Sequence, residues 1–208
     1  QDEPACPAPT TTTCPIPTLP WRFHWLHLIQ NLYPKLKQTQ FPREVQPMAI
    51  KQGDTLPDAI FTKIAAEGPE IVDLANKTAG RKVVIFAVPG AFTPTCNSAH
   101  VPSFIRTKDQ FDAKGVDEII CISVNDPHVM KTWGETTGAT EAGITMLADA
   151  QSLFTTGIGM EFSAPPVGFF ARSKRYAMLV NDGVVTILQE DAPGACDVSA
   201  GEGLLASM

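Results

Sequence analysis

Two continuous apolar runs restrict the fold of this chain more than any other feature of its sequence. RKVVIFAV at 81–88 and EIICISV at 118–124 have the length of strands and are rich in β-branched residues. Neither shows the polar alternation of a strand exposed on one face, so both are expected to be covered on both faces. Between them, apolar residues recur at helical spacing over 96–114, and Gly115 closes that segment.

Further elements follow the second run. A helix is expected to begin near Pro127, because proline is favoured at the first helical position. A third strand is expected at 143–149, and strands at 175–180 and 184–190 flank an Asn-Asp-Gly hairpin signal. This order predicts an α/β fold with a central mixed β-sheet flanked by helices. It is compatible with a thioredoxin-like sandwich and with other small α/β folds.

Composition divides the chain at residue 47. Residues 1–47 hold nine of the 18 prolines and none of the 15 glycines, and their net charge is +1, whereas 48–208 carry −7. The Pro/Thr tract at the start of this leader offers too little apolar surface to offset the entropy of the chain. We therefore expect a Pro/Thr-rich N-terminal extension at 1–47, disordered or targeting, and a self-contained acidic domain at 48–208.

Three interpretations of the leader are open. A mitochondrial transit segment should be rich in arginine, and the leader has two arginines. A membrane-surface helix at 21–33 lacks the Lys/Arg expected on its polar face. A dispensable extension is favoured, with a cytoplasmic protein expected and a mitochondrial one as the alternative.

The whole-chain composition excludes several classes. A net charge of −6 argues against a nucleic-acid partner. No uninterrupted apolar stretch is long enough for a transmembrane helix, so no membrane partner is expected. Five cysteines, an odd number in a chain of 208 residues, favour an intracellular thiol protein over a disulfide scaffold. No spacing of His, Cys and carboxylates indicates a metal site.

The turn between the first apolar run and the following helix ends on Cys96. An anion there is favoured by the helix dipole and by backbone N–H groups of the first turn. Cysteine reacts as thiolate, and the dipole alone contributes about 0.3–2 kcal/mol, so a strongly reactive thiol needs a second positive partner, for which arginine is suited. The alternative is a small buried hydrophobic residue, although two prolines and a glycine give this turn a defined shape.

The turn PGAFTPTC resembles the active-site signature of the peroxiredoxins, in particular the group of mammalian peroxiredoxin 5 and the plant type II enzymes. Pro89, Thr93 and Cys96 fill its pattern P-x-x-x-T-x-x-C. The resemblance covers 48–208 and none of 1–47. Its other segments are MAIKQGDTLPD at 48–58, ISVNDPHVM at 122–130, LAD at 147–149 and ARSKRYAMLVNDG at 171–183.

The resemblance implies a thioredoxin-fold thiol peroxidase that needs no metal or organic cofactor. Cys96 would attack the O–O bond of hydrogen peroxide or an alkyl hydroperoxide and become a sulfenic acid. Thr93 would hydrogen-bond the thiolate and the peroxide, Arg172 would favour the thiolate and polarise the peroxide, and Pro89 would shape the pocket. Two roles stay open for Arg175: support of the site, or an ordinary surface or ion-pair role. His100, one helical turn after Cys96, is open between a pocket role and a structural one.

A sulfenic acid must then be reduced by a thiol. Cys196 is favoured, because it falls in the C-terminal loop where mammalian-type enzymes carry their resolving cysteine, although the flanking residues do not align cleanly. Cys121 lies 25 residues after Cys96, as a second cysteine does in several relatives, but in a strand expected to be buried. The third alternative is direct resolution by glutathione, glutaredoxin or thioredoxin. The resemblance further implies a homodimer.

Two other functions are weighed against the peroxidase. In a peroxide sensor or redox relay, Cys96 would oxidise and pass a disulfide to a partner protein. A thioredoxin-fold scaffold without turnover would have no need for Pro89, Thr93, Cys96 and Arg172 together.

Overall fold

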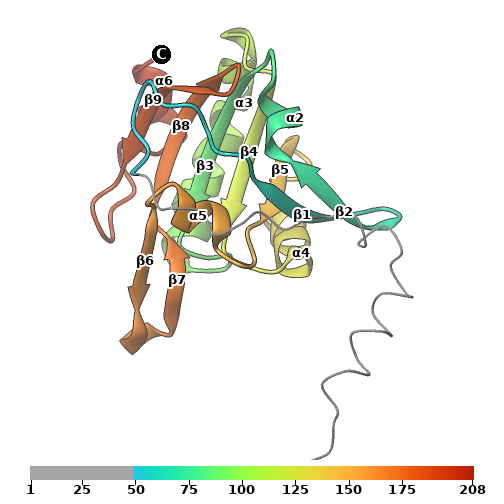
Figure 1. The fold of residues 1–208 in the computed structure, drawn as a ribbon, viewed down its shortest axis with the longest axis vertical. Coiled ribbons are helices and arrows are strands. Elements are labelled where there is room, and N and C mark those ends of the chain that lie inside the picture. The colour runs from blue at the N-terminus through green and yellow to red at the C-terminus, as the bar shows by residue number, and fades with distance from the viewer. Residues whose placement is uncertain (1–48) are drawn as a thin grey trace, which may run out of the picture. The chain divides into compact units, whose positions relative to one another are not determined.

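The computed structural model describes residues 49–208, so the predicted leader and its boundary lie outside the described residues. Seven strands form one sheet in the order β2-β1-β5-β4-β3-β8-β9 (Figure 1). The three central strands run parallel, while β8 is antiparallel to β3 and β1 is antiparallel to β5. The strands are β1 (Ile60–Ala65), β2 (Gly68–Asp73), β3 (Lys82–Val88), β4 (Glu118–Ser123), β5 (Ile144–Ala148), β8 (Tyr176–Asn181) and β9 (Val184–Glu190).

The sheet separates two apolar cores. Alternate residues of β3 point to opposite faces: Phe86 and Val88 join one cluster of buried side chains, and Ile85 joins the other. Because both faces are covered, β3 and β4 carry continuous apolar runs rather than alternating ones. The prediction of two doubly covered strands is therefore confirmed.

Helices on each side supply the covering side chains. Those contributing to the core with Phe86 are α3 (Val101–Ala113), α4 (Pro127–Thr137) and α6 (Gly201–Ala206). Those contributing to the core with Ile85 are α2 (Leu74–Thr78) and α5 (Leu153–Gly157). Figure 1 shows α3 behind the sheet and α5 in front of it. This is the mixed sheet flanked by helices that the sequence predicts.

The helix expected over 96–114 is divided in the structure. Its first turn, η2 (Cys96–His100), is π-helical, and α3 begins at Val101. Pro102 lies in the first turn of α3, and because the chain is already helical in η2, its missing N–H leaves the preceding π-helical turn without one backbone donor. A π-helical turn is a frequent feature of functional sites, because the extra residue redirects the side chains around it.

Two hairpins were not predicted. β1 and β2 pair with each other, and a separate two-stranded sheet is formed by β6 (Glu161–Ala164) and β7 (Phe169–Ser173), joined by the 3₁₀ turn η3 (Pro165–Val167). Most residues of these strands are exposed or half-buried, so their sequences lack the apolar run that reveals β3.

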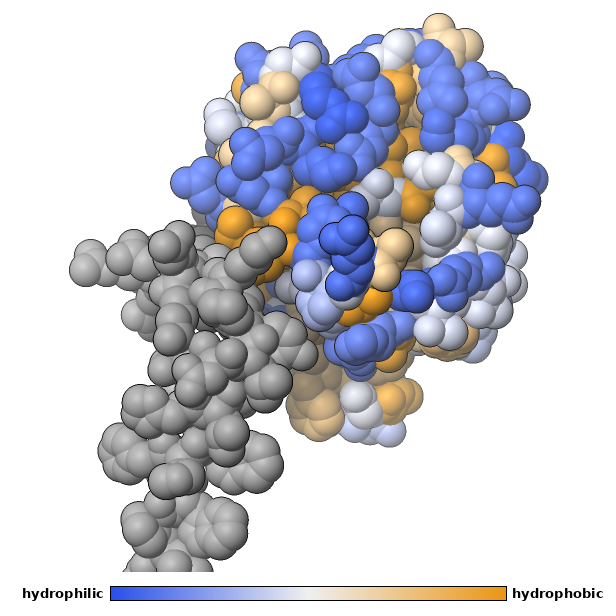
Figure 2. All heavy atoms as spheres, turned by 90° about the vertical axis from the view of Figure 1, so that its right-hand side faces the viewer, coloured by the Kyte–Doolittle hydropathy of each residue, from blue (hydrophilic) through white to orange (hydrophobic). Residues whose placement is uncertain are grey.

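The surface on the side of β1 and β2 is mainly hydrophilic, with smaller apolar patches between the polar side chains (Figure 2). Among residues 49–208, no helix has the length and apolar character needed to cross a bilayer.

Candidate active site

The turn that links β3 to η2 is held by its own hydrogen bonds. Pro89 directly follows β3 and is half-buried. Thr93 donates twice to the carbonyl of Gly90, from its backbone N–H at 3.4 Å and from its hydroxyl at 2.9 Å. Phe92 has a φ of 61°, a conformation that a bulky residue adopts only when the surroundings enforce it. The turn therefore has one defined shape.

The end of β4 braces this turn from the neighbouring strand. The side-chain oxygen of Asn125 accepts hydrogen bonds from the N–H of Ala91 at 3.0 Å and from the hydroxyl of Ser123 at 2.8 Å. A Cβ at Gly90 would lie 3.3 Å from Nη1 of Arg172, so the backbone approaches this guanidinium closely. The brace fixes the residues that precede Cys96.

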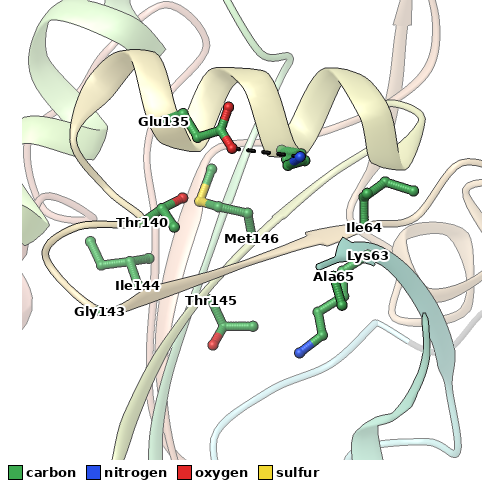
Figure 3. Close-up of a pocket in the computed structure, with 10 residues that line it drawn as sticks. Lys63, Ile64, Ala65, Glu135, Thr140, Gly143, Ile144, Thr145 and Met146 are labelled. Carbon is green, nitrogen blue, oxygen red and sulfur yellow. Dashed lines mark ion pairs between the residues drawn. The ribbon is translucent and has the colours of Figure 1, made fainter. Parts of the chain in front are cut away.

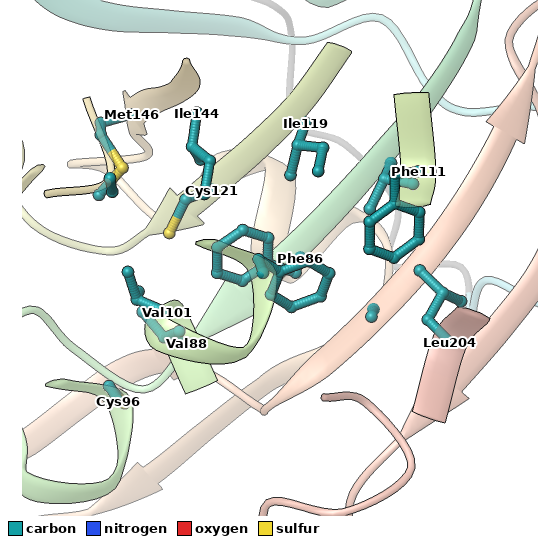
Figure 4. Close-up of a cluster of buried hydrophobic side chains, with 14 of the residues drawn as sticks. Phe86, Val88, Cys96, Val101, Phe111, Ile119, Cys121, Ile144, Met146 and Leu204 are labelled. Atoms are coloured by element: carbon teal, nitrogen blue, oxygen red, sulfur yellow. The ribbon is translucent and has the colours of Figure 1, made fainter. Parts of the chain in front are cut away.

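Cys96 is fully buried at the first position of η2 and is a free thiol. Its neighbours in the core cluster include Val88 and Val101 (Figure 4). Nη2 of Arg175 donates to its sulfur at 3.5 Å. Arg175 itself is only 7% exposed, and its Nη1 has no hydrogen-bond partner among residues 49–208. A buried cation with an unused donor thus faces the sulfur.

The contact expected of Arg172 is made by Arg175 instead. Arg172 donates to the carbonyl of Val124 at 2.8 Å and lies 5.6 Å from the ring centre of Phe169. The difference follows from strand register. Ala87 pairs with Tyr176, so the next position in this antiparallel ladder sets Arg175 opposite Val88, beside the turn to Cys96. Arg172 lies in β7, outside that ladder, with its guanidinium close to the backbone of Gly90.

The alternation of β8 is the signal that identifies this arginine. Tyr176 and Met178 belong to the core on the α5 side, and Ala177 belongs to the core that contains Cys96. Extending the alternation back by two residues from Ala177 places Arg175 on the face of Cys96.

The other two described cysteines differ in their surroundings. Cys121 is fully buried in β4, and burial raises the pKa of its thiol well above the ordinary value. Cys196 is half-buried in the loop after β9. Burial raises its pKa too, the positive charge of Arg175 opposes that shift, and the charges of Asp191 and Cys96 add to it. Cys196 is therefore within electrostatic range of Arg175 and Cys96.

His100 is buried beneath the C-terminal segment. Its Nε2 lies 2.9 Å from the carbonyl oxygen of Ser199. The pKa of His100 is lowered to about 4, mainly because burial disfavours the charged ring; the charge of Arg175 adds to this shift, and the Ser199 hydrogen bond and the charge of Asp191 oppose it. The ring is therefore neutral at pH 7. Its Nδ1 is buried without a partner among residues 49–208.

A separate groove lies between β1, α4 and β5, with a volume of about 330 Å³ (Figure 3). The ion pair of Lys131 with Glu135, at 3.8 Å, lies on its wall. None of the candidate residues around Cys96 lines it. In the described part of the chain, no three His, Cys or carboxylate side chains are grouped so that they could hold a metal ion.

Comparisons with known proteins bear on this geometry. The Redoxin family model matches residues 51–205. Rice (Oryza sativa subsp. japonica) peroxiredoxin-2E-2, chloroplastic, is 44% identical over 163 residues, which are 76% of this chain and 72% of the relative. Peroxiredoxin-2B of Arabidopsis thaliana is 38% identical over 78% of this chain and 99% of its own.

Two solved peroxiredoxin structures have the same fold as this chain. Reduced Prx3 of Vibrio vulnificus in complex with H₂O₂ has a TM-score of 0.72 and 48% identity, covering 76% of this chain and 98% of that one. Peroxiredoxin 5 of Alvinella pompejana has a TM-score of 0.67 and 34% identity, covering 76% and 97%.

A thioredoxin-like sheet with a buried thiol at the turn after a central strand, facing an arginine, defines a thiol oxidoreductase. The identity and coverage of the matches narrow the class: the chain belongs to the peroxiredoxins of the Redoxin family and is a thiol-dependent peroxidase. Membership implies a hydroperoxide substrate and a thiol reductant.

Proposed function

We propose that Cys96 is the peroxidatic cysteine and that Arg175, rather than Arg172, activates it. The observation that carries this assignment is the buried guanidinium of Arg175, which donates to the Cys96 sulfur at 3.5 Å and keeps Nη1 unused. Charge-assisted hydrogen bonds stabilise a thiolate more than a neutral thiol. The unused Nη1 supplies a donor for a peroxide oxygen on which negative charge develops.

In this mechanism the Cys96 thiolate attacks one oxygen of R–O–O–H. The S–O bond forms while the O–O bond breaks, the leaving alkoxide takes a proton, and Cys96 becomes a sulfenic acid. Thr93 already donates its hydroxyl hydrogen to Gly90, so its oxygen is free to accept the peroxide O–H. Pro89 limits water access beside the turn. The products are a sulfenic acid and ROH, with no cofactor required.

Hydrogen peroxide is the first substrate to test, because the Vibrio relative binds H₂O₂ in its solved structure. Alkyl hydroperoxides share the O–O–H group that the mechanism uses.

For the second step we favour Cys196 over Cys121. Cys196 is half-buried in a loop that follows the last strand of the sheet. Cys121 lies inside β4, where burial strongly disfavours its thiolate and its movement would disrupt the sheet. The resulting disulfide would then be reduced by an external thiol. Thioredoxin, or glutathione with glutaredoxin, suits this step chemically.

A homodimer is the assembly we propose. Phe92, Val167 and Phe170 are 52%, 66% and 65% exposed, and they supply apolar surface that a second copy of the chain would cover. Sedimentation of the reduced protein, compared with a Phe170→Asp variant, tests this assembly.

For residues 1–47 we propose a targeting role, which replaces the cytoplasmic location as the favoured expectation. They lie outside the Redoxin match, and the rice and Arabidopsis 2E relatives are named chloroplastic. A fusion of 1–47 to a fluorescent protein tests the proposal. Diffuse cytoplasmic fluorescence would support a dispensable extension instead.

One stopped-flow experiment tests the peroxidase assignment. Reduced protein is mixed with sub-stoichiometric hydrogen peroxide, and wild type is compared with Cys96→Ser and Cys121→Ser. Wild type and Cys121→Ser should consume peroxide rapidly, and Cys96→Ser should not. Consumption at the rate of an ordinary thiol would refute the assignment. Fast oxidation without turnover by any thiol reductant would favour the sensor or relay.

A further inference from the structure

The loop that carries Cys196 is closed by a buried carboxylate. Oδ1 of Asp191 accepts hydrogen bonds from the backbone N–H groups of Asp197 and Ser199, each at 3.2 Å. Its Oδ2 accepts the hydroxyl hydrogen of Ser199 at 2.5 Å. Asp191 is 6% exposed and Ser199 fully buried. One carboxylate thus ties the two ends of the segment that contains Cys196.

The same serine ties the loop to the helix that starts at Cys96. Nε2 of His100 lies 2.9 Å from the Ser199 carbonyl oxygen and 3.1 Å from its hydroxyl. A carbonyl only accepts, so Nε2 carries the hydrogen and donates it. His100 comes one helical turn after Cys96. Its side chain therefore connects the Cys96 turn with the Cys196 loop.

Two further contacts fasten the loop at its flanks. The N–H of Asp191 donates at 3.0 Å to the carbonyl of Arg175, the residue whose guanidinium contacts Cys96. The N–H of Gly201 donates to the hydroxyl of Ser103 on α3 at 2.8 Å. Both flanks are thus attached to the elements that surround the Cys96 thiol.

These attachments bear on the second half of the reaction. A disulfide requires the two sulfur atoms to approach to about 2.05 Å with a restricted backbone separation. Here Cys96 is fully buried and Cys196 half-buried, and both are free thiols. One of them has to leave its place before the bond can form. The loop moves only when the contacts of Asp191 and Ser199 break.

We propose that Asp191, Ser199 and His100 are positioning residues that retain the Cys196 loop and thereby set the rate at which Cys196 reaches oxidised Cys96. The inference rests on the proposed resolving role of Cys196. In that step the Cys196 thiolate attacks the sulfenic sulfur of Cys96. The S–S bond forms, the S–O bond breaks, and the departing hydroxide takes up a proton to become water.

Retention of the Cys196 loop favours overoxidation of Cys96 when peroxide is in excess. While the loop is held, the sulfenic acid of Cys96 persists and can react with a second peroxide, which converts it to sulfinic acid. Faster release of the loop gives more disulfide and less sulfinic acid, without any change in the first oxidation step.

The test compares Ser199→Ala and Asp191→Asn with wild type and with Asp197→Asn. The last is a matched control, because Asp197 is exposed in the same loop and contributes only its backbone N–H to the carboxylate. After a peroxide pulse, samples are quenched by acid and alkylation. Mass spectrometry then counts Cys96 as sulfenic acid, sulfinic acid or disulfide to Cys196.

We expect disulfide formation to be about tenfold faster in Ser199→Ala, corresponding to about 1.4 kcal/mol. We also expect less sulfinic acid at a fixed peroxide concentration. Sulfenic acid should form at the wild-type rate, and Asp197→Asn should match wild type throughout. Disulfide formation in Ser199→Ala at the wild-type rate, or slower, would overturn the proposal. Asp191→Asn supplies the same test if Ser199→Ala does not fold.

A second readout does not depend on the resolving role. In the reduced protein, alkylation of Cys196 by iodoacetamide should be faster in Ser199→Ala than in wild type and Asp197→Asn. Equal rates would refute retention of the loop. Faster alkylation with no disulfide to Cys196 in any variant would instead refute the resolving role and with it the proposed control of that step.

Discussion

Replacing Arg175 by alanine tests the geometry of the site directly. The substitution removes a buried donor that lies 3.5 Å from the Cys96 sulfur. Its backbone carbonyl, which accepts from Asp191 N–H, remains in place, so the C-terminal loop keeps that attachment. The matched variant is Arg172→Ala. It removes the same charge three residues earlier in the chain, from a side chain that contacts Val124 and Phe169 rather than Cys96.

The expected magnitude follows from the contact. Hydrogen bonds to charged groups contribute about 1.5–3 kcal/mol, and about 1.4 kcal/mol corresponds to a factor of ten in rate. Arg175 is 7% exposed, so water replaces little of the lost interaction. Oxidation of Cys96 by hydrogen peroxide should therefore slow by about 10- to 150-fold in Arg175→Ala. In Arg172→Ala it should slow by about threefold or less, with a lower melting temperature.

Trp133 provides the assay. Its indole N–H donates to the side chain of Asn97, the residue after Cys96, at 3.0 Å. Replacing Trp21 and Trp25 by phenylalanine makes Trp133 the remaining indole fluorophore. Stopped-flow fluorescence then follows the Cys96 turn during oxidation, and loss of free thiol calibrates the signal. An Arg175→Ala rate within twofold of wild type, or an equal loss in Arg172→Ala, would refute the assignment.

Two further substitutions test the fold around the site. The carboxylate of Glu118 forms ion pairs with Lys77 at 2.8 Å and Arg81 at 2.7 Å. Burial acts to raise the pKa of Glu118, but its hydrogen bonds outweigh burial and keep the pKa below the ordinary value of 4.5. Because the pKa is depressed in the folded state, this stabilisation is present above the unfolded pKa and is lost as the pH falls through the folded pKa. In urea unfolding, Glu118→Gln should therefore lower the free energy of unfolding by about 2 kcal/mol at pH 7 and progressively less below about pH 4.5. A loss of stability that does not depend on pH would contradict this origin. Gly201→Ala should lower stability by about 1–3 kcal/mol, since its Cβ would lie 2.8 Å from the carbonyl oxygen of Ser103, and an unchanged melting temperature would show that α6 is free to shift.

Local patterns predicted the central part of the fold. β3 and β4 were predicted because a strand covered on both faces is apolar at nearly every position. The hairpin of β8 and β9 was predicted from its turn, where Asp182 has a φ of 49° and Gly183 a φ of 75°. The β1–β2 and β6–β7 hairpins escaped prediction because their half-exposed strands lack both signals.

The sequence by itself determined that a thiol stands at the first turn after a buried strand, since Pro89, Thr93 and Cys96 are neighbours along the chain. Such local placement depends on backbone geometry that a few residues specify.

Only the tertiary structure decided which arginine meets that thiol and what retains Cys196. Arg175 reaches Cys96 through the register of β8 on β3, across 79 residues of chain. His100 meets Ser199 across 99 residues. Contacts of this range depend on how sheet, helix and C-terminal loop pack together, and packing is a property of the whole domain rather than of any segment of its sequence.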